Sequence, residues 1–263
     1  MGGDKLISKS VCGVSGLVGP ELLGIAGVSP AINSVKSRLL KVSETDLNVL
    51  LLGESGTGKT MMARIIHDRS TRKGKPFVSL NMAAIPDVLA ESELFGTVNG
   101  AYTGAVNRPG FVSVADGGTL FLDEIAELSL AMQAKLLHFI ESGNFCRVGS
   151  TAVHHVDVRI ICATNANLEE LVAERKFNEA LYYRIHKAVV KIPPLRNRRE
   201  DVLELSRFFL SKKGYNYNSF TPEALSCLEK YDWPGNVRQL ESCLAVTCEL
   251  NKNQEIGPDD LIF

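Results

Sequence analysis

Residues 53–60 constrain the fold of this chain more than any other part of its sequence. They match the pattern G-x-x-x-x-G-K-[ST], and they follow a glycine-bounded apolar run that is typical of a strand in a parallel sheet. A helical pattern comes next, so backbone N–H groups and the positive end of that helix would face a phosphate. The alternative is a glycine-rich turn that binds nothing, but the order strand, loop, helix favours phosphate binding. The residues predicted to bind phosphate are Gly53, Glu54, Ser55, Gly56, Thr57, Gly58, Lys59 and Thr60.

An acidic pair, Asp123 and Glu124, follows another predicted strand. In this pattern Lys59 would neutralise the β- and γ-phosphates of a bound nucleotide, and the Thr60 hydroxyl and Asp123 would hold Mg²⁺. Glu124 would orient and deprotonate an attacking water, which predicts hydrolysis rather than binding alone. Acids after a strand are weak evidence by themselves, since helix N-termini attract carboxylates. Together with the phosphate-binding pattern upstream, the pair strongly indicates a site that hydrolyses a bound triphosphate.

Apolar runs alternate with helical patterns along most of the chain. The predicted strands lie at 48–53, 77–80, 119–122, 158–163 and 188–192. Their alternation with helices such as 130–140 indicates an α/β fold, with a parallel sheet between two layers of helices. Thr164 and Asn165 follow the fourth of these strands, where a polar side chain would reach a γ-phosphate or the attacking water. An ordinary boundary between strand and loop is the alternative interpretation of Asn165.

The pattern changes after the prolines at 193–194. The helices predicted beyond them are 201–212, 222–230 and 237–250. No strand is predicted between them, and Thr221 before Pro222 is typical of a helix start. We therefore expect a small all-helical domain after the α/β domain, and we interpret the start of the chain as a linker or the remnant of a longer protein. The expected boundaries are 1–21, 22–193 and 194–263.

Charge and composition exclude several classes of function. The 29 basic and 30 acidic residues leave a formal net charge of −1, so bulk positive charge does not hold this chain on nucleic acid. No apolar stretch is long enough to span a membrane and the N-terminus lacks the layout of a signal peptide, so we expect a cytoplasmic protein. The six cysteines lack CxxC spacing and are expected to be reduced thiols. His154 and His155 fit a solvated loop better than a metal site.

These motifs together resemble the AAA+ ATPase domain of bacterial enhancer-binding proteins, the activators of sigma-54 RNA polymerase. The resemblance covers residues 22–263, and its second part corresponds to the helical lid of that family. The segments that carry it are 53–60, 93–96, 100–105, 110–125, 183–184, 193–196 and 233–241. The hexapeptide at 100–105 is the most diagnostic, because other AAA+ branches lack it.

The resemblance implies that the hexapeptide contacts the sigma-54 factor from the tip of a surface loop. Its residues are Gly100, Ala101, Tyr102, Thr103, Gly104 and Ala105. Two glycines permit hinge-like changes of the backbone, and an exposed aromatic ring is typical of protein contacts. The family usually has phenylalanine where this chain has Tyr102, and a tyrosine that packs inward is the alternative. Residues 149–156 correspond to a second loop that supports the first.

The resemblance also implies roles for residues outside the two nucleotide motifs. Asn81 would restrain Glu124 until the partner is engaged, and Ile25 and Gly27 would lie where the chain passes the adenine. Arg184 would be an arginine finger that reaches the γ-phosphate of a neighbouring subunit, which can increase the rate by about 10³–10⁵. Arg238 would sense the nucleotide from the lid of the same chain. For the two arginines, a surface salt bridge and a helix-stabilising charge are the respective alternatives.

A finger that acts in trans implies a head-to-tail ring. The resemblance implies that this ring is a hexamer or a heptamer. Three positions depart from the family pattern. Thr60 replaces a usual glutamate and should favour Mg²⁺ coordination, whereas Asn178 and Ala180 replace an interface arginine and an aspartate. Weaker coupling between subunits is therefore expected. The regulatory and DNA-binding domains usual in this family are not found in the sequence, so we expect no direct DNA binding and interpret the chain as a central domain or a natural minimal form.

The function predicted from these features is ATP hydrolysis in a ring that remodels the closed complex of sigma-54 RNA polymerase and activates transcription. Two alternatives stay open. One is a nucleotide-dependent module that binds a protein partner without productive hydrolysis, which the substitutions at Asn178 and Ala180 suggest. The other is a different AAA+ machine such as a DNA-helicase loader, against which the hexapeptide and the lack of basic runs argue.

Overall fold

A five-stranded parallel sheet forms the centre of the larger part of the molecule, in the strand order β2-β5-β8-β1-β9. The computed structural model describes residues 24–251 and 255–263, so the linker expected at 1–21 lies outside the described residues. The strands are β1 (Val49–Leu52), β2 (Phe77–Asn81), β5 (Thr119–Asp123), β8 (Arg159–Thr164) and β9 (Ala188–Lys191). Each lies within about two residues of a predicted strand, which confirms the α/β prediction.

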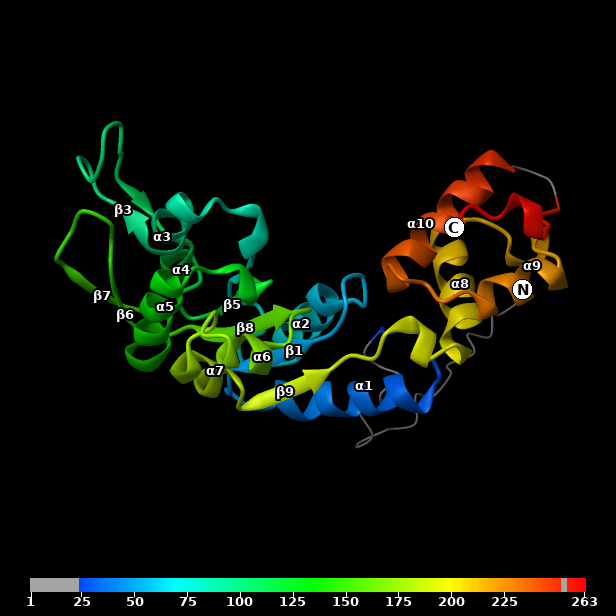
Figure 1. Cartoon of the computed structure of the whole chain (residues 1–263), viewed down its shortest axis with the longest axis horizontal. Helices are drawn as coiled ribbons and strands as arrows, with labels where there is room; N and C mark the ends of the chain where they lie inside the picture. Colours follow the sequence, from blue (N-terminus) through cyan, green and yellow to red (C-terminus); the bar gives the residue numbers. More distant parts are fainter. Residues whose placement is uncertain (1–23, 252–254) are drawn as a thin grey trace, which may run out of the picture.

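Helices cover both faces of this sheet (Figure 1). Leu120 and Leu122 of β5 pack in one apolar cluster, while Phe121 between them packs in the cluster of the opposite face. This alternation follows from the two-residue repeat of a strand that is buried on both sides. On the first face lie α3 (Asp87–Phe95), α4 (Phe111–Val114), α5 (Leu130–Ser142), α6 (Leu168–Ala173) and α7 (Glu179–Ile185). On the second lie α1 (Pro30–Ser43) and α2 (Lys59–Asp68).

The two helices of the second face begin differently. The Ser29 hydroxyl caps α1 by accepting the N–H of Ile32, and proline occupies the first position of that helix. At the start of α2, by contrast, no side chain of the described residues caps the helix, and Gly58 precedes it with a left-handed backbone. Residues 53–60 form the phosphate-binding loop, or P-loop, and the first N–H groups of α2 lie at its end without a side-chain acceptor, as an anion-binding helix requires.

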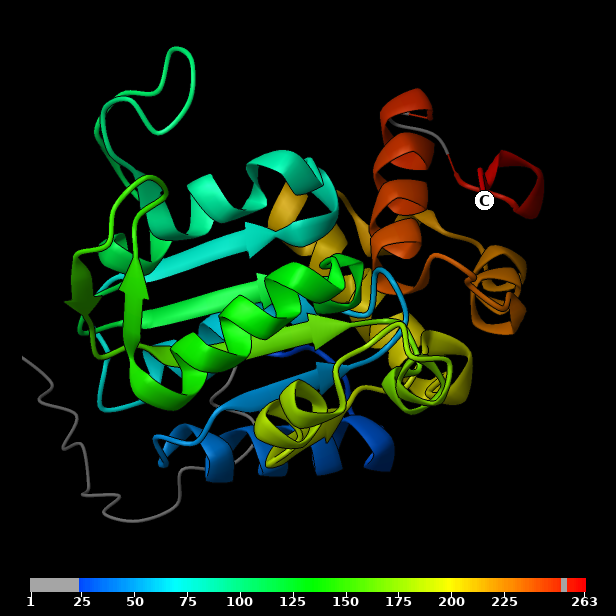
Figure 2. The same ribbon diagram turned by 60° about the vertical axis from the view of Figure 1, so that its left-hand side comes forward.

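Two antiparallel hairpins lie at the end of the sheet away from the lid (Figure 2). Strands β3 (Gly96–Thr97) and β4 (Arg108–Pro109) enclose the loop that carries the hexapeptide, and β6 (Asn144–Cys146) pairs with β7 (Val153–His155). The expectation of a solvated loop at His154 and His155 is wrong, because both belong to β7. The His154 ring stacks on Phe145 at 5.5 Å, and His155 Nδ1 lies 2.9 Å from the side-chain oxygen of Asn144.

The remaining residues form a helical lid with its own core. Its helices are α8 (Glu200–Lys213), α9 (Pro222–Lys230) and α10 (Asn236–Leu250), and the short η4 (Leu195–Asn197) precedes them. The core centres on the fully buried Trp233, whose Nε1 donates to the carbonyl oxygen of Leu228 at 2.8 Å. The predicted start of α9 is confirmed, since the Thr221 hydroxyl caps it and proline is its first residue.

Composition led to expectations about cysteines, metal sites and membrane spans, and the described residues can be compared with each of them. Their five cysteines are free thiols, and no group of three or more histidine, cysteine or acidic side chains among them is placed to hold a metal ion. Among the same residues, every helix is too short or too polar to cross a membrane.

Candidate functional site

A cavity of about 550 Å³ lies between the P-loop, the carboxyl ends of the central strands and the lid. We call it the P-loop cavity, and Figure 2 shows the strands of the sheet pointing toward the lid that closes it. The predicted residues that line it are Ile25, Ser55, Gly56, Thr57, Gly58, Lys59, Thr60, Asn81, Asp123, Glu124 and Arg238. The structure thus brings most of the predicted nucleotide site together around one hollow, in agreement with the tendency of ligands to bind at the carboxyl ends of parallel strands.

Lys59 is held inside the P-loop by backbone carbonyl groups. Its side chain is only 6% exposed, and Nζ donates to the carbonyl oxygen of Gly53 at 2.8 Å. Nζ also lies 3.5 Å from Oε1 of Glu124. A phosphate group in the cavity would share this ammonium with Glu124, so the lysine connects the phosphate site to the residue predicted to act as the base.

Thr60 and Asp123 approach each other across the cavity, from the first turn of α2 and the end of β5. The Thr60 hydroxyl lies 3.4 Å from Oδ2 of Asp123. Mg²⁺ prefers oxygen ligands and is usually bound by one or two protein groups together with phosphate oxygens and waters. This hydroxyl and carboxylate therefore fit a magnesium ion that accompanies a nucleotide.

Glu124 has an unusual backbone conformation for a residue that is not glycine. Its φ is 51°, in the left-handed region, where such outliers concentrate at functional sites. The N–H of Asn165 donates to Oε2 of Glu124 at 3.3 Å. Asn165 therefore contacts the predicted base through its backbone, whereas the sequence suggested a role for its side chain.

Asn81 lines the same cavity, and its Cα pairs with that of Asp123 across the β2–β5 ladder. Its side-chain oxygen accepts the N–H of Ala83 at 3.0 Å, which caps the short helix η2 (Met82–Ala84). Within residues 24–251 and 255–263, no hydrogen bond joins Asn81 to Glu124. Restraint of Glu124 by Asn81 stays a prediction, and in this structure Lys59 and Asn165 hold the carboxylate.

The lid contacts the P-loop through hydrogen bonds from α10 and η4. Backbone N–H of Arg238 donates to the carbonyl oxygen of Gly56 at 3.2 Å, and Nη1 of Arg238 lies 3.4 Å from the hydroxyl of Ser55. Glu54 accepts from Nη1 of Arg196 at 2.7 Å, and this hydrogen bond holds the pKa of the Glu54 carboxyl below its usual value. Glu54 therefore faces the lid rather than the cavity. The side chain of Asn236 donates to the carbonyl oxygen of Ser55 at 3.0 Å.

Gly56 permits this close contact, which gives a testable prediction. Its φ is +77°, and a Cβ there would overlap the carbonyl oxygen of Gly235 in the lid. We expect Gly56→Ala to weaken nucleotide binding by about 1–3 kcal/mol, because overpacking would push the lid away from the P-loop. Gly74→Ala is the matched control, since its φ of +80° is similar and nothing lies within 4 Å of the added Cβ. Equal ATP affinities of the two variants, measured by titration calorimetry, would contradict the prediction.

Gly27 and Gly53 lie next to the P-loop cavity but do not line it. Gly27 accepts a hydrogen bond from Nζ of Lys36 at 2.7 Å, and a Cβ at Gly27 would press on the carboxyl group of Asp201. The N–H groups of the next two residues donate to that carboxylate. Gly27 therefore lets the segment that contains Ile25 lie against the lid, and it is a positioning residue rather than a direct contact.

Arg184 lies in α7, outside the P-loop cavity of its own chain. Its Nη2 lies 3.4 Å from the carbonyl oxygen of Ile140, and the neighbouring Tyr183 is 64% exposed. Asn178, one of the departures noted above, caps this helix by accepting the N–H of Leu181 at 3.0 Å. The substitution therefore has a structural role at the start of the helix that carries the predicted finger.

The hexapeptide lies at the end of the molecule opposite the lid (Figure 1). The side chain of Tyr102 is 51% exposed, so the alternative of an inward-packed ring does not hold in this structure. Gly100 and Gly104 both have positive φ, at 79° and 83°. The N–H of Val98, at the base of this loop, donates to the carbonyl oxygen of Val148 at 3.2 Å, directly before residues 149–156; support of the first loop by the second stays a prediction.

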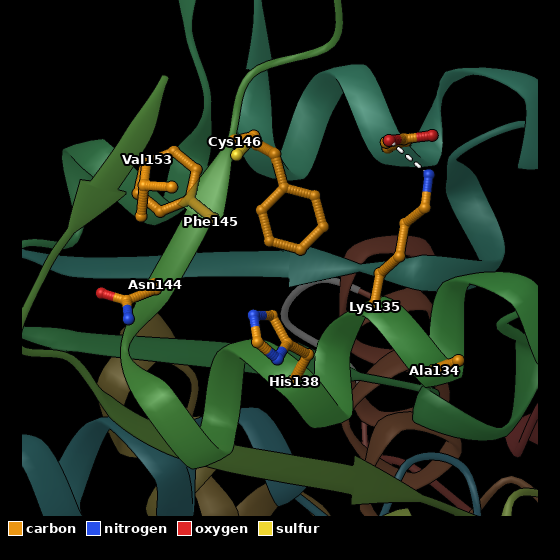
Figure 3. A pocket seen from close by; sticks show the side chains of 9 residues that line it. Ala134, Lys135, His138, Asn144, Phe145, Cys146 and Val153 are labelled. Carbon is orange, nitrogen blue, oxygen red and sulfur yellow. Dashed lines mark ion pairs between the residues drawn. The ribbon is translucent and has the colours of Figure 1, made fainter. Parts of the chain in front are cut away.

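A second hollow of about 440 Å³ lies between α3, α5 and the β6–β7 hairpin (Figure 3). Phe95 and Phe145 line it, and Lys135 pairs with Glu91 across it. Its lining is mostly apolar and includes no predicted site residue from the described part of the chain. The P-loop cavity, which carries the charged groups that phosphate chemistry requires, is therefore the candidate active site.

Sequence reasoning missed several polar residues of this site. Arg196, Arg198, Asp201 and Asn236 connect the lid to the P-loop, the cavity or the segment before α1. Arg196 and Asn236 belong to segments 193–196 and 233–241, which were recognised as motifs without a role for these side chains. The sequence motifs marked both segments. The partners of these side chains lie more than 140 residues away along the chain, so the motifs did not show which groups they bind.

Comparisons with known proteins agree with this geometry. The family described as the sigma-54 interaction domain matches residues 25–191, and the AAA+ ATPase lid domain matches residues 196–263. The Nif-specific regulatory protein of Azorhizobium caulinodans is 47% identical over 242 residues, which cover 90% of this chain and 39% of that protein. Regulatory protein LuxO of Vibrio parahaemolyticus is 45% identical over 243 residues, covering 90% of this chain and 54% of that protein.

Solved structures show the same likeness. Crystal structures of NtrX from Brucella abortus, one in complex with ADP and one in complex with ATP, each superpose with a TM-score of 0.83 at 34% identity. They cover 91% of this chain and 55 to 56% of the NtrX chains. The chain spans about half the length of these relatives, or less. It belongs to the sigma-54 interaction domain family, the AAA+ ATPase domains of sigma-54-dependent enhancer-binding activators, and it includes that family's helical lid.

Proposed function

We propose that this chain hydrolyses ATP at sites shared between neighbouring subunits of a ring, a hexamer or a heptamer, and uses the reaction to move the hexapeptide loop against sigma-54 factor in RNA polymerase. The result would be transcription activation. The observation that carries the proposal is the set of charged groups around the P-loop cavity, with Lys59 between the P-loop carbonyl groups and Glu124. The ATP and ADP complexes of the related NtrX support the choice of nucleotide.

The predicted residues of the P-loop and of the end of β5 would take separate parts in the reaction. The P-loop N–H groups and Lys59 would bind the phosphates, and Thr60 and Asp123 would hold Mg²⁺. Bound Mg²⁺ supplies positive charge that offsets the charge of the triphosphate. Glu124 would accept a proton from water, and its carboxylate is restrained on both oxygens, by Lys59 and by the N–H of Asn165. Competition of a γ-phosphate for Lys59 would free one of these oxygens.

A short stretch of chain links the cavity to the hexapeptide. Asn81 lines the cavity, η2 follows it, and α3 then leads directly into β3 at the base of the loop. The nine residues of α3 span about 13 Å as a rigid helix. A shift at the end of β2 would therefore be carried to the loop by one helix, which gives ATP turnover a physical route to the proposed sigma-54 contact.

The proposed boundaries of the two domains are 22–193 and 194–263. Residues 53–60 and 123–124 lie in the first and Arg238 in the second, so the cavity forms between them. Arg184 would complete the site of the neighbouring subunit, which the position of α7 outside its own cavity supports.

Steady-state phosphate release, measured over a series of protein concentrations, tests the shared site. We expect the rate per subunit to rise with concentration, because assembly creates the complete sites. A rate that stays at zero over the series, with ATP still bound, would favour the alternative of a nucleotide-dependent binding module.

Deletion of residues 102–104 tests the role of the hexapeptide. The loop lies at the far end of the sheet from the P-loop cavity and none of its residues lines that cavity, so we expect ATPase activity within about twofold of the parent together with loss of activation. Activation is measured as transcript yield from a sigma-54 promoter with the sigma-54 holoenzyme. Tyr102→Phe, which keeps the ring, is the control and should retain activation. Activation by the deletion variant would contradict the assignment of the loop.

A further inference from the structure

Arg198 is a buried cation in the wall of the P-loop cavity, and none of the roles described above uses it. It lies between η4 and α8, is 3% exposed and lines the cavity. Its neighbours in sequence behave differently: Arg196 pairs with Glu54, and the exposed Arg199 pairs with Asp232 on the lid surface. A charged side chain that is buried without full pairing is rare in folded proteins, because desolvation is costly.

The donors of Arg198 are not satisfied by the protein. Nη1 lies 3.9 Å from Oδ2 of Asp201, which is a long ion pair. Nε and Nη2 are buried and have no hydrogen-bond partner among residues 24–251 and 255–263. Burial lowers the pKa of the guanidinium, and Asp201 opposes this effect only in part. An unpaired buried donor costs about 1–3 kcal/mol, so these two nitrogen atoms favour a ligand that brings acceptors into the cavity.

Asp201 cannot supply the missing acceptors, because its oxygens already serve the segment before α1. Oδ1 accepts the N–H groups of Val28 and Ser29 at 2.6 and 2.7 Å, and Oδ2 accepts the Ser29 hydroxyl at 2.8 Å. The carboxylate is fully buried. It thus fixes the segment that contains Ile25 on the lid and places Arg198 beside that segment.

The surroundings of Arg198 indicate which half of a nucleotide it would meet. The phosphate end of the cavity is marked by Lys59 and by the N–H groups at the start of α2. The wall formed by the segment before α1 and by α8 is instead largely apolar, with Ile25, Leu205 and Phe209. An apolar wall with a few placed polar groups suits a flat base and its ribose, not a phosphate.

We propose that Arg198 donates from Nε and Nη2 to acceptor atoms of the nucleoside half of ATP, a ring nitrogen of the base or a ribose oxygen. This inference rests on the proposed function, in which the P-loop cavity binds ATP. Since Arg198 belongs to the lid and Asp201 ties it to the segment before α1, the contact would make closure of the lid depend on the base and ribose as well as on the phosphates. Arg198 is therefore a binding residue that distinguishes a complete nucleotide from a phosphate chain.

Titration calorimetry of the full chain with ATP and with inorganic tripolyphosphate, both with Mg²⁺, tests the proposal. Arg198→Met keeps the length of the side chain and removes its donors. We expect its affinity for ATP to fall about 10- to 100-fold, as for the loss of hydrogen bonds to a charged group, with tripolyphosphate affinity within about twofold of the parent. Arg198→Lys, which keeps the charge without the planar pair of donors, should give an intermediate loss for ATP. Arg199→Met is the matched control and should bind both compounds as the parent does.

The outcomes separate this inference from the proposed function. A parallel loss of ATP and tripolyphosphate affinity in Arg198→Met would make Arg198 a phosphate ligand or a support of the lid, and unchanged ATP affinity would remove it from the site; either result overturns the inference alone. Failure of the parent chain to bind ATP would overturn the proposed function as well. Nucleotide-free thermal unfolding of Arg198→Met measures any structural role of Arg198, because the variant removes unpaired buried donors together with the long ion pair to Asp201. A lower midpoint of thermal unfolding, together with a parallel loss of affinity for ATP and tripolyphosphate, would identify a structural role of Arg198.

Discussion

Replacing Glu124 with glutamine is expected to slow ATP hydrolysis by about 10²–10⁴-fold while ATP remains bound, the range for loss of a general base. The amide keeps the size of the side chain and an oxygen for the N–H of Asn165, but it cannot take the proton of the attacking water. The ion pair with Lys59 is also lost, which leaves that ammonium free for phosphate. Hydrolysis is measured as single-turnover phosphate release, and binding as ATP affinity by calorimetry.

Glu127→Gln is the matched control for this experiment. Glu127 lies three residues farther on, in the short helix η3 (Ile125–Glu127); it is exposed and does not line the P-loop cavity. The control should hydrolyse ATP at the parental rate. Retained turnover in Glu124→Gln would exclude Glu124 as the base, and a loss of ATP binding in that variant would show that the carboxylate organises the site rather than the water.

The central strands and the lid helices were predictable because their signals are long or have a local cause. β1 is apolar throughout and β8 is apolar between Arg159 and Thr164, while α9 starts at Thr221 and Pro222, which act within one turn. Strands β3 and β4 have two residues each, too few to show an alternating pattern. The β6–β7 hairpin was missed for the same reason, and with it the true environment of His154.

In the candidate site too, residues of a local motif were predictable, whereas residues placed by contacts distant in sequence were not. Lys59 and Thr60 belong to one local motif whose backbone geometry fixes where they point, so their positions followed from the sequence. Glu54 belongs to the same motif, yet it turns to Arg196 in the lid, and no local pattern encodes that choice. Arg198 and Asp201 are also set by packing of the lid against a distant segment. Contacts between the two domains therefore set the positions of these side chains, which the local motifs do not specify.

The substitution Arg184→Ala is expected to reduce ATP hydrolysis by about 10³–10⁵-fold, the usual contribution of an arginine finger. The expected cause is the loss of positive charge at the γ-phosphate of the neighbouring subunit. ATP affinity of the isolated chain should not change, because Arg184 lies outside the P-loop cavity of its own chain. Lys187→Ala, an exposed cation just beyond α7, is the control and should hydrolyse ATP at the parental rate.

Mixing two inactive variants separates a finger that acts in trans from one that acts in cis. In a random equimolar mixture of Arg184→Ala and Glu124→Gln subunits, a complete site needs Glu124 from one subunit and Arg184 from its neighbour. In a head-to-tail ring about a quarter of the interfaces satisfy this condition, so the mixture should recover about a quarter of the parental rate. If Arg184 acted within its own chain, every site would lack one of the two groups and the mixture would stay inactive. Recovery of activity therefore depends on the site lying between two subunits, which neither single variant can show.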